Sequence, residues 1–327
     1  MPSTGEARDG AATEVTGAAT GAATDAATPF RIVVDPTFGY RHLDPLPSGG
    51  ELDRFYESHY RDLLDEGGRA PDLARLVGGG PDADTEREWQ AATLHADILA
   101  ALDTWLGTGR PRKALDIGCG TGELLRTLVA GGWEAVGTEP APALAAVGRA
   151  TGLDVEAATA AEFIARWEAT GAGPFGAIIL LNVLEHIPDP VRLLTEVLQA
   201  LAPGGLLVVR VPNDFSPLQA AAQLQLGGLP WWVAIPDHVN YFDHASIDAL
   251  VEGVGLEILD RWADFPMEFF LLTGEDYRND PDVGRSVHRR RRQFEMALEP
   301  ELRRSIGRAW AGAGIGRNSI VVARKPA

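Results

Sequence analysis

The sequence predicts an α/β protein in which helices cover both faces of a mostly parallel sheet. From Lys113 onward, short apolar runs alternate with segments that have the periodicity of amphipathic helices. The run 177–181 is apolar at every position and 206–211 is nearly so, as expected for strands that are buried on both faces. An apolar fraction of 45% in 327 residues supplies enough nonpolar surface for such a core.

Before this core, the sequence predicts a disordered tail and a cap. Residues 1–28 are mostly Ala, Thr, Gly and acidic residues, and so few large apolar side chains cannot offset the entropy lost on ordering. We expect 29–110 to form a helical cap on the substrate side and 111–327 to form the main domain. Within the cap we expect a strand near 30–34, a turn over 45–50 and helices over 52–60 and 85–106.

The elements of the main domain follow from its apolar runs and turn residues. The expected strands are 114–117, 134–137, a weak strand near Val155, 177–181 and 206–211. The expected helices are 123–130, 141–150, 160–167 and 191–201, the last ending at Pro203-Gly204-Gly205. After a long aromatic segment over 212–244, we expect a helix over 245–254, a strand over 256–262, a polar helical insertion over about 274–314 and a last strand over 319–323.

Composition narrows the class of partner and the compartment. The net charge is −17, from 46 acidic and 29 basic residues, and such a surface repels nucleic-acid phosphates, so a small molecule or a cationic partner is expected instead. Cys119 is the single cysteine, which excludes an intrachain disulfide and a cysteine-rich zinc site. No secretory signal and no apolar stretch of roughly 20 residues occurs, so we expect a protein of the reducing cytoplasm.

A glycine-rich loop follows the first strand of the main domain. Gly118, Gly120 and Gly122 allow a sharp turn where a ligand must approach the backbone closely. The loop comes at the carboxyl end of a strand, which is where open α/β sheets bind ligands. The alternative is a tight strand-to-helix turn without a ligand.

A carboxylate ends the second strand. Glu139 comes 23 positions after Asp116, which suits an acid that accepts hydrogen bonds from the two hydroxyls of a ribose. The dinucleotide fingerprint would place a third glycine at position 123, where this chain has Glu123. An acidic residue in the first helical turn opposes a pyrophosphate and favours a cationic or zwitterionic ligand over NAD.

Four segments in order along the chain resemble class I S-adenosylmethionine (SAM)-dependent methyltransferases. They are the loop Leu115-Asp116-Ile117-Gly118-Cys119-Gly120-Thr121-Gly122, the acid Glu139, the fourth-strand segment 175–187 and the turn 201–207. The resemblance implies a Rossmann-like fold with a seven-stranded, mostly parallel sheet and an antiparallel last strand. It also implies that SAM is held by Asp116, Gly118, Cys119, Gly120, Thr121, Gly122, Glu139 and Asn182.

Two further segments resemble narrower groups. Residues 236–244 are similar to a segment of small-molecule methyltransferases, which include ubiquinone-type O-methyltransferases, and 39–48 resemble the entry to some sugar and natural-product methyltransferases. Several of the latter carry a cysteine zinc ribbon that this chain lacks. The resemblance implies transfer of a methyl group to a small molecule, at a hydroxyl or an activated carbon.

Histidine is the natural base for a hydroxyl acceptor near neutral pH. His186 follows the fourth strand, at the edge where an acceptor would lie, and is our first candidate; its alternative is a structural hydrogen bond. His238, in the aromatic segment, is the second candidate, and its alternative is loop packing. Glu185-His186 suggests a metal pair, but some quinone O-methyltransferases have an acid where this chain has Asn182, so we expect no metal.

Aromatic and basic residues give the remaining predictions. Trp231, Trp232, Tyr241 and Phe242 are candidates for lining an acceptor pocket, with packing of the segment as the alternative. The run Arg289-Arg290-Arg291-Arg292 is expected to be a solvated helix face that pairs with acids at helical spacing, such as Glu295.

We therefore expect a SAM-dependent methyltransferase of small molecules. A protein that binds SAM on the same fold without catalysis is the first alternative, since fold does not fix function. A nicotinamide-dependent oxidoreductase is the second alternative. The acceptor and the oligomeric state do not follow from the sequence.

Overall fold

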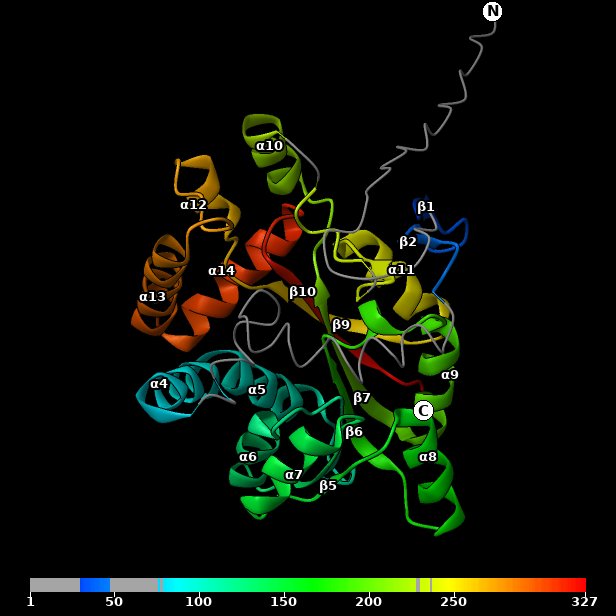
Figure 1. Cartoon of the computed structure of the whole chain (residues 1–327). Helices are drawn as coiled ribbons and strands as arrows, with labels where there is room; N and C mark the ends of the chain where they lie inside the picture. Colours follow the sequence, from blue (N-terminus) through cyan, green and yellow to red (C-terminus); the bar gives the residue numbers. More distant parts are fainter. Residues whose placement is uncertain (1–29, 48–75, 77–78, 228–229, 236) are drawn as a thin grey trace, which may run out of the picture.

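The computed structural model describes residues 30–47, 76, 79–227, 230–235 and 237–327 (Figure 1). The tail predicted over 1–28 and the helix predicted over 52–60 lie outside the described residues. Within the described part of the chain, we find no helix with the length and hydrophobicity needed to span a bilayer.

A seven-stranded sheet forms the centre of the molecule, in the order β5-β4-β3-β6-β7-β10-β9. Its strands are β3 (Lys113–Ile117), β4 (Glu134–Thr138), β5 (Val155–Glu156), β6 (Phe175–Leu181), β7 (Leu201–Pro212), β9 (Glu257–Ala263) and β10 (Asn318–Arg324). Strands β3 to β7 pair in parallel, and β10 pairs antiparallel with both β7 and β9. The predicted mostly parallel sheet with an antiparallel last strand is confirmed.

Helices cover both faces of this sheet (Figure 1). They are α4 (Gly80–Gln90), η1 (Ala91–His95), α5 (Ala96–Trp105), α6 (Glu123–Ala130), α7 (Pro142–Ala150), α8 (Ala160–Ala169), η2 (Leu184–His186), α9 (Pro190–Ala200), α10 (Pro217–Leu226), α11 (His244–Gly253), α12 (Glu268–Leu272), α13 (Pro281–Ala297) and α14 (Pro300–Gly312). Neighbouring side chains of a strand point to opposite faces, so Ile178 packs with residues of α8, α9 and α11, whereas Ile179 packs with residues of α5, α6 and α7. Both isoleucines are completely buried, as the uninterrupted apolar run predicts.

The start of β7 differs from the prediction. The sequence places a helix end and turn at Pro203-Gly204-Gly205, whereas the strand already begins at Leu201. Leu201 pairs with Phe175 and Leu206 with Ala177, so the expected turn is accommodated as an irregularity inside the strand. Gly204 has a φ of 72°, which a glycine adopts without steric cost.

The predicted helix over 85–106 is longer and interrupted. It begins at Gly80, because Pro81 suits the first turn of a helix, where its missing N–H is not needed. Its middle, Ala91–His95, widens into a π-helical turn that buries Thr93 and His95. This helix therefore packs against the main domain through polar as well as apolar residues.

A second sheet joins the N-terminal segment to the aromatic segment. It has the order β1-β2-β8, with β1 (Arg31–Val34), β2 (Arg41–Asp44) and β8 (Asn240–Tyr241). Only β1 was predicted, because β8 is too short to show a pattern. The pairing of β2 with β8 fixes the aromatic segment close to η2.

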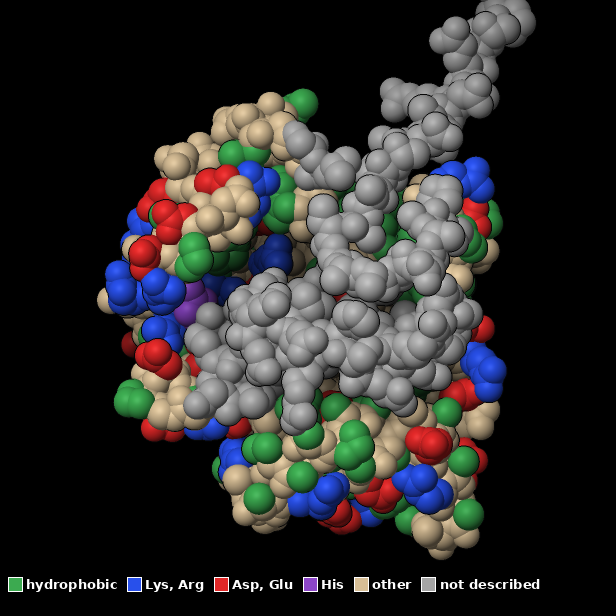
Figure 2. All heavy atoms as spheres, in the orientation of Figure 1, with side chains coloured by type: hydrophobic (Ala, Val, Ile, Leu, Met, Phe, Trp, Pro, Cys, Tyr) green, Lys and Arg blue, Asp and Glu red, His purple; other side chains and the backbone are tan. Residues whose placement is uncertain are grey.

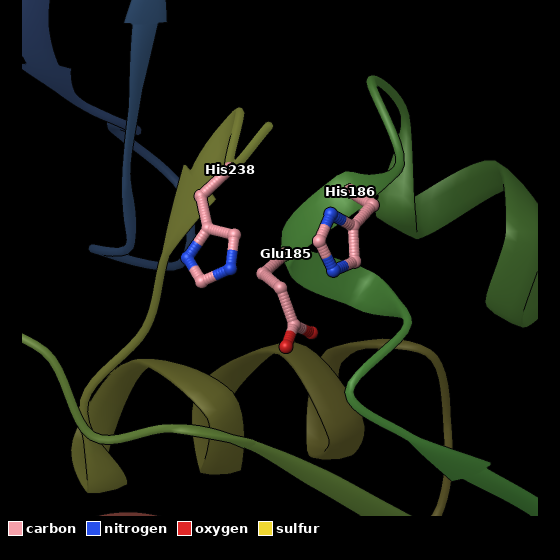
Figure 3. A group of neighbouring side chains, drawn as sticks. All are labelled: Glu185, His186 and His238. Atoms are coloured by element: carbon pink, nitrogen blue, oxygen red, sulfur yellow. The ribbon is translucent and has the colours of Figure 1, made fainter. Parts of the chain in front are cut away.

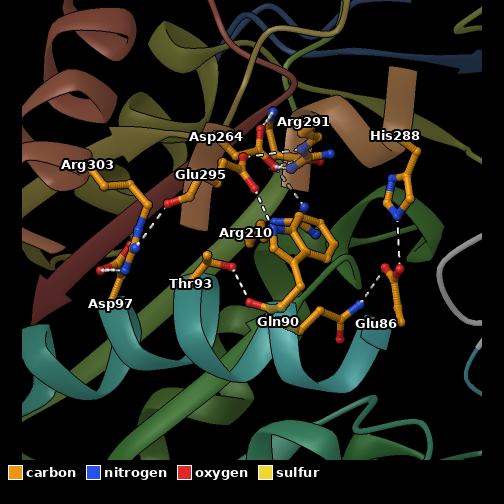
Figure 4. A network of polar contacts seen from close by, with 12 residues as sticks. Glu86, Gln90, Thr93, Asp97, Arg210, Asp264, His288, Arg291, Glu295 and Arg303 are labelled. Carbon is orange, nitrogen blue, oxygen red and sulfur yellow. Dashed lines mark hydrogen bonds and ion pairs between the residues drawn. The ribbon is translucent and has the colours of Figure 1, made fainter. Parts of the chain in front are cut away.

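The arginine run is only half solvated, which corrects the sequence-based prediction. Arg289 and Arg290 are exposed, but Arg291 is buried and Arg292 is partly buried beneath α4. Figure 4 shows Arg291 within a network of polar contacts between α13 and α4. Arg291 donates to Glu295 at 3.2 Å, the helical pairing that was predicted. The second half of the run therefore anchors α13 to the rest of the protein.

Candidate active site

The glycine loop has the backbone geometry that its sequence predicts. Gly118, Gly120 and Gly122 have φ values of 70°, 56° and 85°, in the region that favours glycine. A Cβ on Gly118 would lie 2.8 Å from a methyl group of Val183, so the loop passes directly against the segment after β6. The N–H of Gly118 donates to the carbonyl of Thr138 at 2.8 Å, which ties the loop to β4. The loop therefore joins the carboxyl ends of three neighbouring strands.

Glu139 lies at the end of β4, where the sequence predicts a ribose-binding acid. Its carboxylate accepts hydrogen bonds from the N–H of Gly120 at 3.0 Å and the N–H of Ala141 at 2.8 Å. Each carboxylate oxygen has two lone pairs, so these bonds leave acceptor capacity for a pair of hydroxyls. The geometry fits a nucleoside whose sugar lies beside the glycine loop.

Asp116 and Cys119 complete the predicted loop residues in a buried environment. Burial raises the pKa of Asp116 to about 8, and the charge of Glu139 adds to the effect. Burial also raises the pKa of the Cys119 thiol, so this cysteine is not a reactive thiolate. Burial raises the pKa of Glu139 too, although its two backbone hydrogen bonds oppose the shift. Burial thus disfavours the charged forms of these acidic groups, and a bound cationic ligand would favour them.

Glu123 does not stand alone as a negative charge at the start of α6, contrary to the prediction that it opposes an anion. Arg87 of α4 donates to Glu123 at 3.1 Å, and Arg126 lies 3.4 Å from its other oxygen. Two guanidinium groups therefore compensate the charge of Glu123. The lack of a glycine at position 123 still separates the loop from the dinucleotide pattern, but the charge of Glu123 does not.

Asn182 directly follows β6 in a left-handed conformation, with a φ of 57°. Its side-chain amide donates to Glu185 at 2.9 Å, and its carbonyl oxygen accepts from Arg210. Asn182 therefore links the loop after β6 to β7. Its predicted contact with SAM stays a prediction.

Three side chains converge beyond β6: Glu185, His186 and His238 (Figure 3). The two histidine rings meet edge to face, with centroids 4.9 Å apart. His186 Nδ1 lies 3.0 Å from the backbone oxygen of Asp237 and 3.1 Å from its carboxylate. Burial alone would lower the pKa of His186, but the hydrogen bond to Asp237 and the charge of Glu185 outweigh it and raise the pKa to about 9.

The same three residues are the group in the described part of the chain that best matches a metal site. One donor atom from each lies within 4.8 Å of the others. Glu185 is 1% exposed, and its Oε2 has no hydrogen-bond partner among the described residues. However, its Oε1 accepts a hydrogen bond from the side-chain amide of Asn182. Asn182 stands where some quinone O-methyltransferases have an acid.

We therefore expect methyl transfer to survive removal of metal ions. Dialysis against EDTA is expected to leave the initial rate within about twofold, because His186 is already oriented by Asp237. The rate is measured with radiolabelled SAM before and after chelation, with Mg²⁺ and Zn²⁺ added back separately. A loss of activity that one ion restores would show that the prediction of no metal is wrong.

Glu139→Ala is expected to weaken SAM binding. Losing a hydrogen bond to a charged group costs about 1.5–3 kcal/mol, so the Kd should rise roughly 10- to 100-fold. Calorimetric titration measures the change. Glu134→Ala is the matched control, because Glu134 lies at the other end of β4 with an exposed side chain paired to Lys113. Equal affinity for the two variants would remove Glu139 from the ribose role.

The four predicted aromatic residues differ in exposure. Tyr241 and Phe242 are completely buried and belong to different hydrophobic clusters, so packing accounts for both. Trp232 is nearly buried and meets Trp231 edge to face at 4.7 Å. Trp231 is partly exposed, with the guanidinium of Arg278 over its ring at 5.0 Å. Acceptor binding by these residues stays a prediction, and Trp231 is the member with accessible surface.

Sequence reasoning overlooked several charged residues near the same edge of the sheet. Asp214 comes just after β7, and the rule that singled out Glu139 would have found it. Asp264 follows β9 and binds Arg210, the partner of Asn182. Glu268 begins α12 and Arg317 directly precedes β10, and no sequence pattern marks either residue.

Comparison with known proteins agrees with this geometry. A family model described as a methyltransferase domain matches residues 86–261, more than half of the chain. A ubiquinone biosynthesis O-methyltransferase from Caulobacter sp. is 29% identical over 178 residues, which cover 52% of this chain and 69% of that protein. One from Ruegeria pomeroyi is 30% identical over 176 residues, which cover 50% and 68%.

Among solved structures, a SAM-dependent methyltransferase from Archaeoglobus fulgidus has the same fold. Its TM-score is 0.50 at 17% identity, and the match covers 81% of this chain and 100% of that chain. The fold, the glycine loop with its acid at the next strand, and the family model lead to one assignment. The chain belongs to the methyltransferase family and is a class I SAM-dependent methyltransferase with a Rossmann-like fold.

Proposed function

We propose that the chain transfers the methyl group of SAM to a hydroxyl oxygen of a small-molecule acceptor, with His186 as the base. The observation that carries this proposal is the pairing of His186 with Asp237. Val183, three positions before His186, packs directly against Gly118 of the glycine loop. The relatives named as O-methyltransferases support an oxygen acceptor over a carbon acceptor. The net charge of −17 favours a small molecule over a nucleic acid.

When bound, SAM supplies a methyl group on a positively charged sulfur. Glu139 and the glycine loop are proposed to hold the nucleoside and amino-acid ends, which fixes the direction from which an acceptor oxygen can approach. Positioning two reactants in line contributes on the order of 7–11 kcal/mol in favourable cases. This is the largest contribution that we assign to the protein.

The proton of the acceptor hydroxyl is proposed to go to His186. Its Nδ1 faces Asp237, which orients the ring with Nε2 as the atom that accepts the proton. The acceptor oxygen then bonds to the methyl carbon as the carbon–sulfur bond breaks. His238, whose ring packs against His186, is the second candidate for this role.

Isotopically labelled SAM, incubated with the protein and an extract of the source organism, tests the proposal. We expect one or a few labelled small molecules by mass spectrometry, with the label on oxygen by NMR. Binding of SAM without any labelled product would support a non-catalytic SAM-binding protein. Tight NADH binding without SAM binding would support an oxidoreductase instead.

A further inference from the structure

A second group of ionisable side chains lies near the proposed site and has no role in the steps described above. Asp214 follows β7, Glu268 begins α12, Tyr277 precedes α13 and Arg317 precedes β10. Asp214 is 3% exposed and Glu268 is 1% exposed. The charge of Arg317 acts on both carboxyl groups, and that of Glu268 acts on Asp214, so segments far apart in the sequence converge here.

Several polar atoms of this group lack hydrogen bonds in the described part of the chain. They are both carboxylate oxygens of Glu268, Oδ2 of Asp214 and the hydroxyl of Tyr277. The other oxygen of Asp214 has only a long bond, at 3.5 Å, from Gln219. Leaving a buried polar group without a partner costs about 1–3 kcal/mol, and more for a charged group. The fold alone therefore gives no reason for these side chains.

The neighbouring Asp264 shows how this protein satisfies a structural buried acid. Its carboxylate accepts from Arg210 at 2.9 Å, from Arg291 at 3.2 Å and from the side chain of Asn318 at 2.6 Å. Glu268, which is 1% exposed against 13% for the side chain of Asp264, has no such bond among the described residues. This contrast indicates that the carboxyl groups of Glu268 and Asp214 bind a ligand.

The position of the group points to the acceptor rather than to SAM. The charge of Glu185, the neighbour of His186, acts on Asp214, whereas Asp116 responds to Glu139 at the other side of the site. In the space-filling view, the surface beside α12 and α13 is hollowed, with basic side chains in the hollow (Figure 2). Asp214 directly follows β7, so the group lies on the β7 side of the proposed base.

The charges of the group indicate the chemistry of its ligand. The carboxyl groups of Asp214 and Glu268 both feel the charge of Arg317, and Glu268 also feels that of Arg291. An anionic ligand would add a third negative charge to this buried place. A protonated amine would instead donate up to three hydrogen bonds to the unpartnered oxygens and favour the charged form of both acids.

We propose that Asp214 and Glu268, which lie beside Arg317, form the acceptor-binding end of the active site and accept hydrogen bonds from a protonated amine of the acceptor. This proposal rests on the methyl transfer proposed above. The amine is the anchor of the acceptor, and the methyl group goes to a hydroxyl elsewhere on the same molecule. Glu268 and Asp214 are therefore specificity-determining residues.

The labelled product from the extract experiment provides the test. Treatment with an amine-reactive reagent should shift the mass of the labelled product. Glu268→Gln and Asp214→Asn should each require at least tenfold more extract for half-maximal labelling, with the Kd for SAM unchanged. Glu275→Gln is the control, because Glu275 pairs with exposed Arg290 on the outside of α13.

A thermal melt at neutral pH gives a readout apart from activity. Removing an unpaired buried charge should raise the melting temperature of Glu268→Gln by several degrees, whereas loss of a structural residue would lower it. A labelled product without an amine, or unchanged labelling by both variants, would overturn this inference and leave methyl transfer standing. Complete absence of labelled product would overturn both.

Discussion

Asp264→Ala is expected to lower the free energy of unfolding by about 3–5 kcal/mol, the range for removing one partner of a buried ion pair. The substitution leaves Arg210 and Arg291 without the carboxylate that both contact, and both guanidinium groups are largely buried. It also removes the acceptor for the backbone N–H and the side-chain amide of Asn318 at the start of β10. Chemical denaturation at neutral pH measures the loss.

Asp103→Ala is the matched control for this measurement. Asp103 lies in α5 and pairs with Arg112, and because their side chains are 47% and 44% exposed, the variant should lose less than about 1 kcal/mol. A loss of that small size for Asp264→Ala would mean that the network contributes little to stability. In that case the network would have only a positioning role, through Arg210 and Asn182.

Asp264 should also make the free energy of unfolding depend on pH in the acidic range. Burial raises the pKa of Asp264, but the charges of Arg291 and Arg210 outweigh it and hold the pKa below its ordinary value. The contribution of Asp264 is therefore complete above the unfolded pKa of about 3.9 and is lost as the pH falls through the folded pKa. Asp264→Asn should show a weaker loss of stability over this acidic range than the unchanged protein.

The sheet and its glycine loop could be predicted because their signals are local. A strand buried on both faces shows itself as an apolar run, and the residue after it faces the ligand-binding edge whatever the distant chain does. The conformations of Gly118, Gly120 and Gly122 follow from the same few residues. Even the weak strand near Val155 was found, as β5.

The partners of charged residues could not be predicted, because they come from distant segments. Arg87, which compensates Glu123, lies 36 positions earlier on a different helix. His186 depends on Asp237, which the pairing of β2 with β8 holds in place through two residues of an unpredicted strand. Arg291 was expected in solvent because its neighbours in sequence are basic, whereas its surroundings are set by Asp264.

His186→Ala is expected to reduce kcat by about 10²–10⁴-fold, the contribution typical of a positioned general base, while the Kd for SAM stays within about twofold. SAM affinity should persist because the glycine loop and Glu139 do not depend on the imidazole. Single-turnover rates with labelled SAM and the identified acceptor measure the effect. His42→Ala is the matched control, since His42 lies in β2 and its Nδ1 lies 2.9 Å from the backbone oxygen of its neighbour Leu43.

The pH dependence of the rate separates a base from a residue that only packs. With a pKa of about 9, His186 is protonated at neutral pH, so the rate should rise with pH and level off above about 9. Asp237→Asn removes the carboxylate beside Nδ1, which should lower the pKa of His186 and move the rise to lower pH. If His186→Ala has the same rate as the wild-type protein and the same increase of rate with pH, the proton must go to His238 or to no histidine. If Asp237→Asn slows the reaction without moving the rise, Asp237 positions the ring but does not set its pKa.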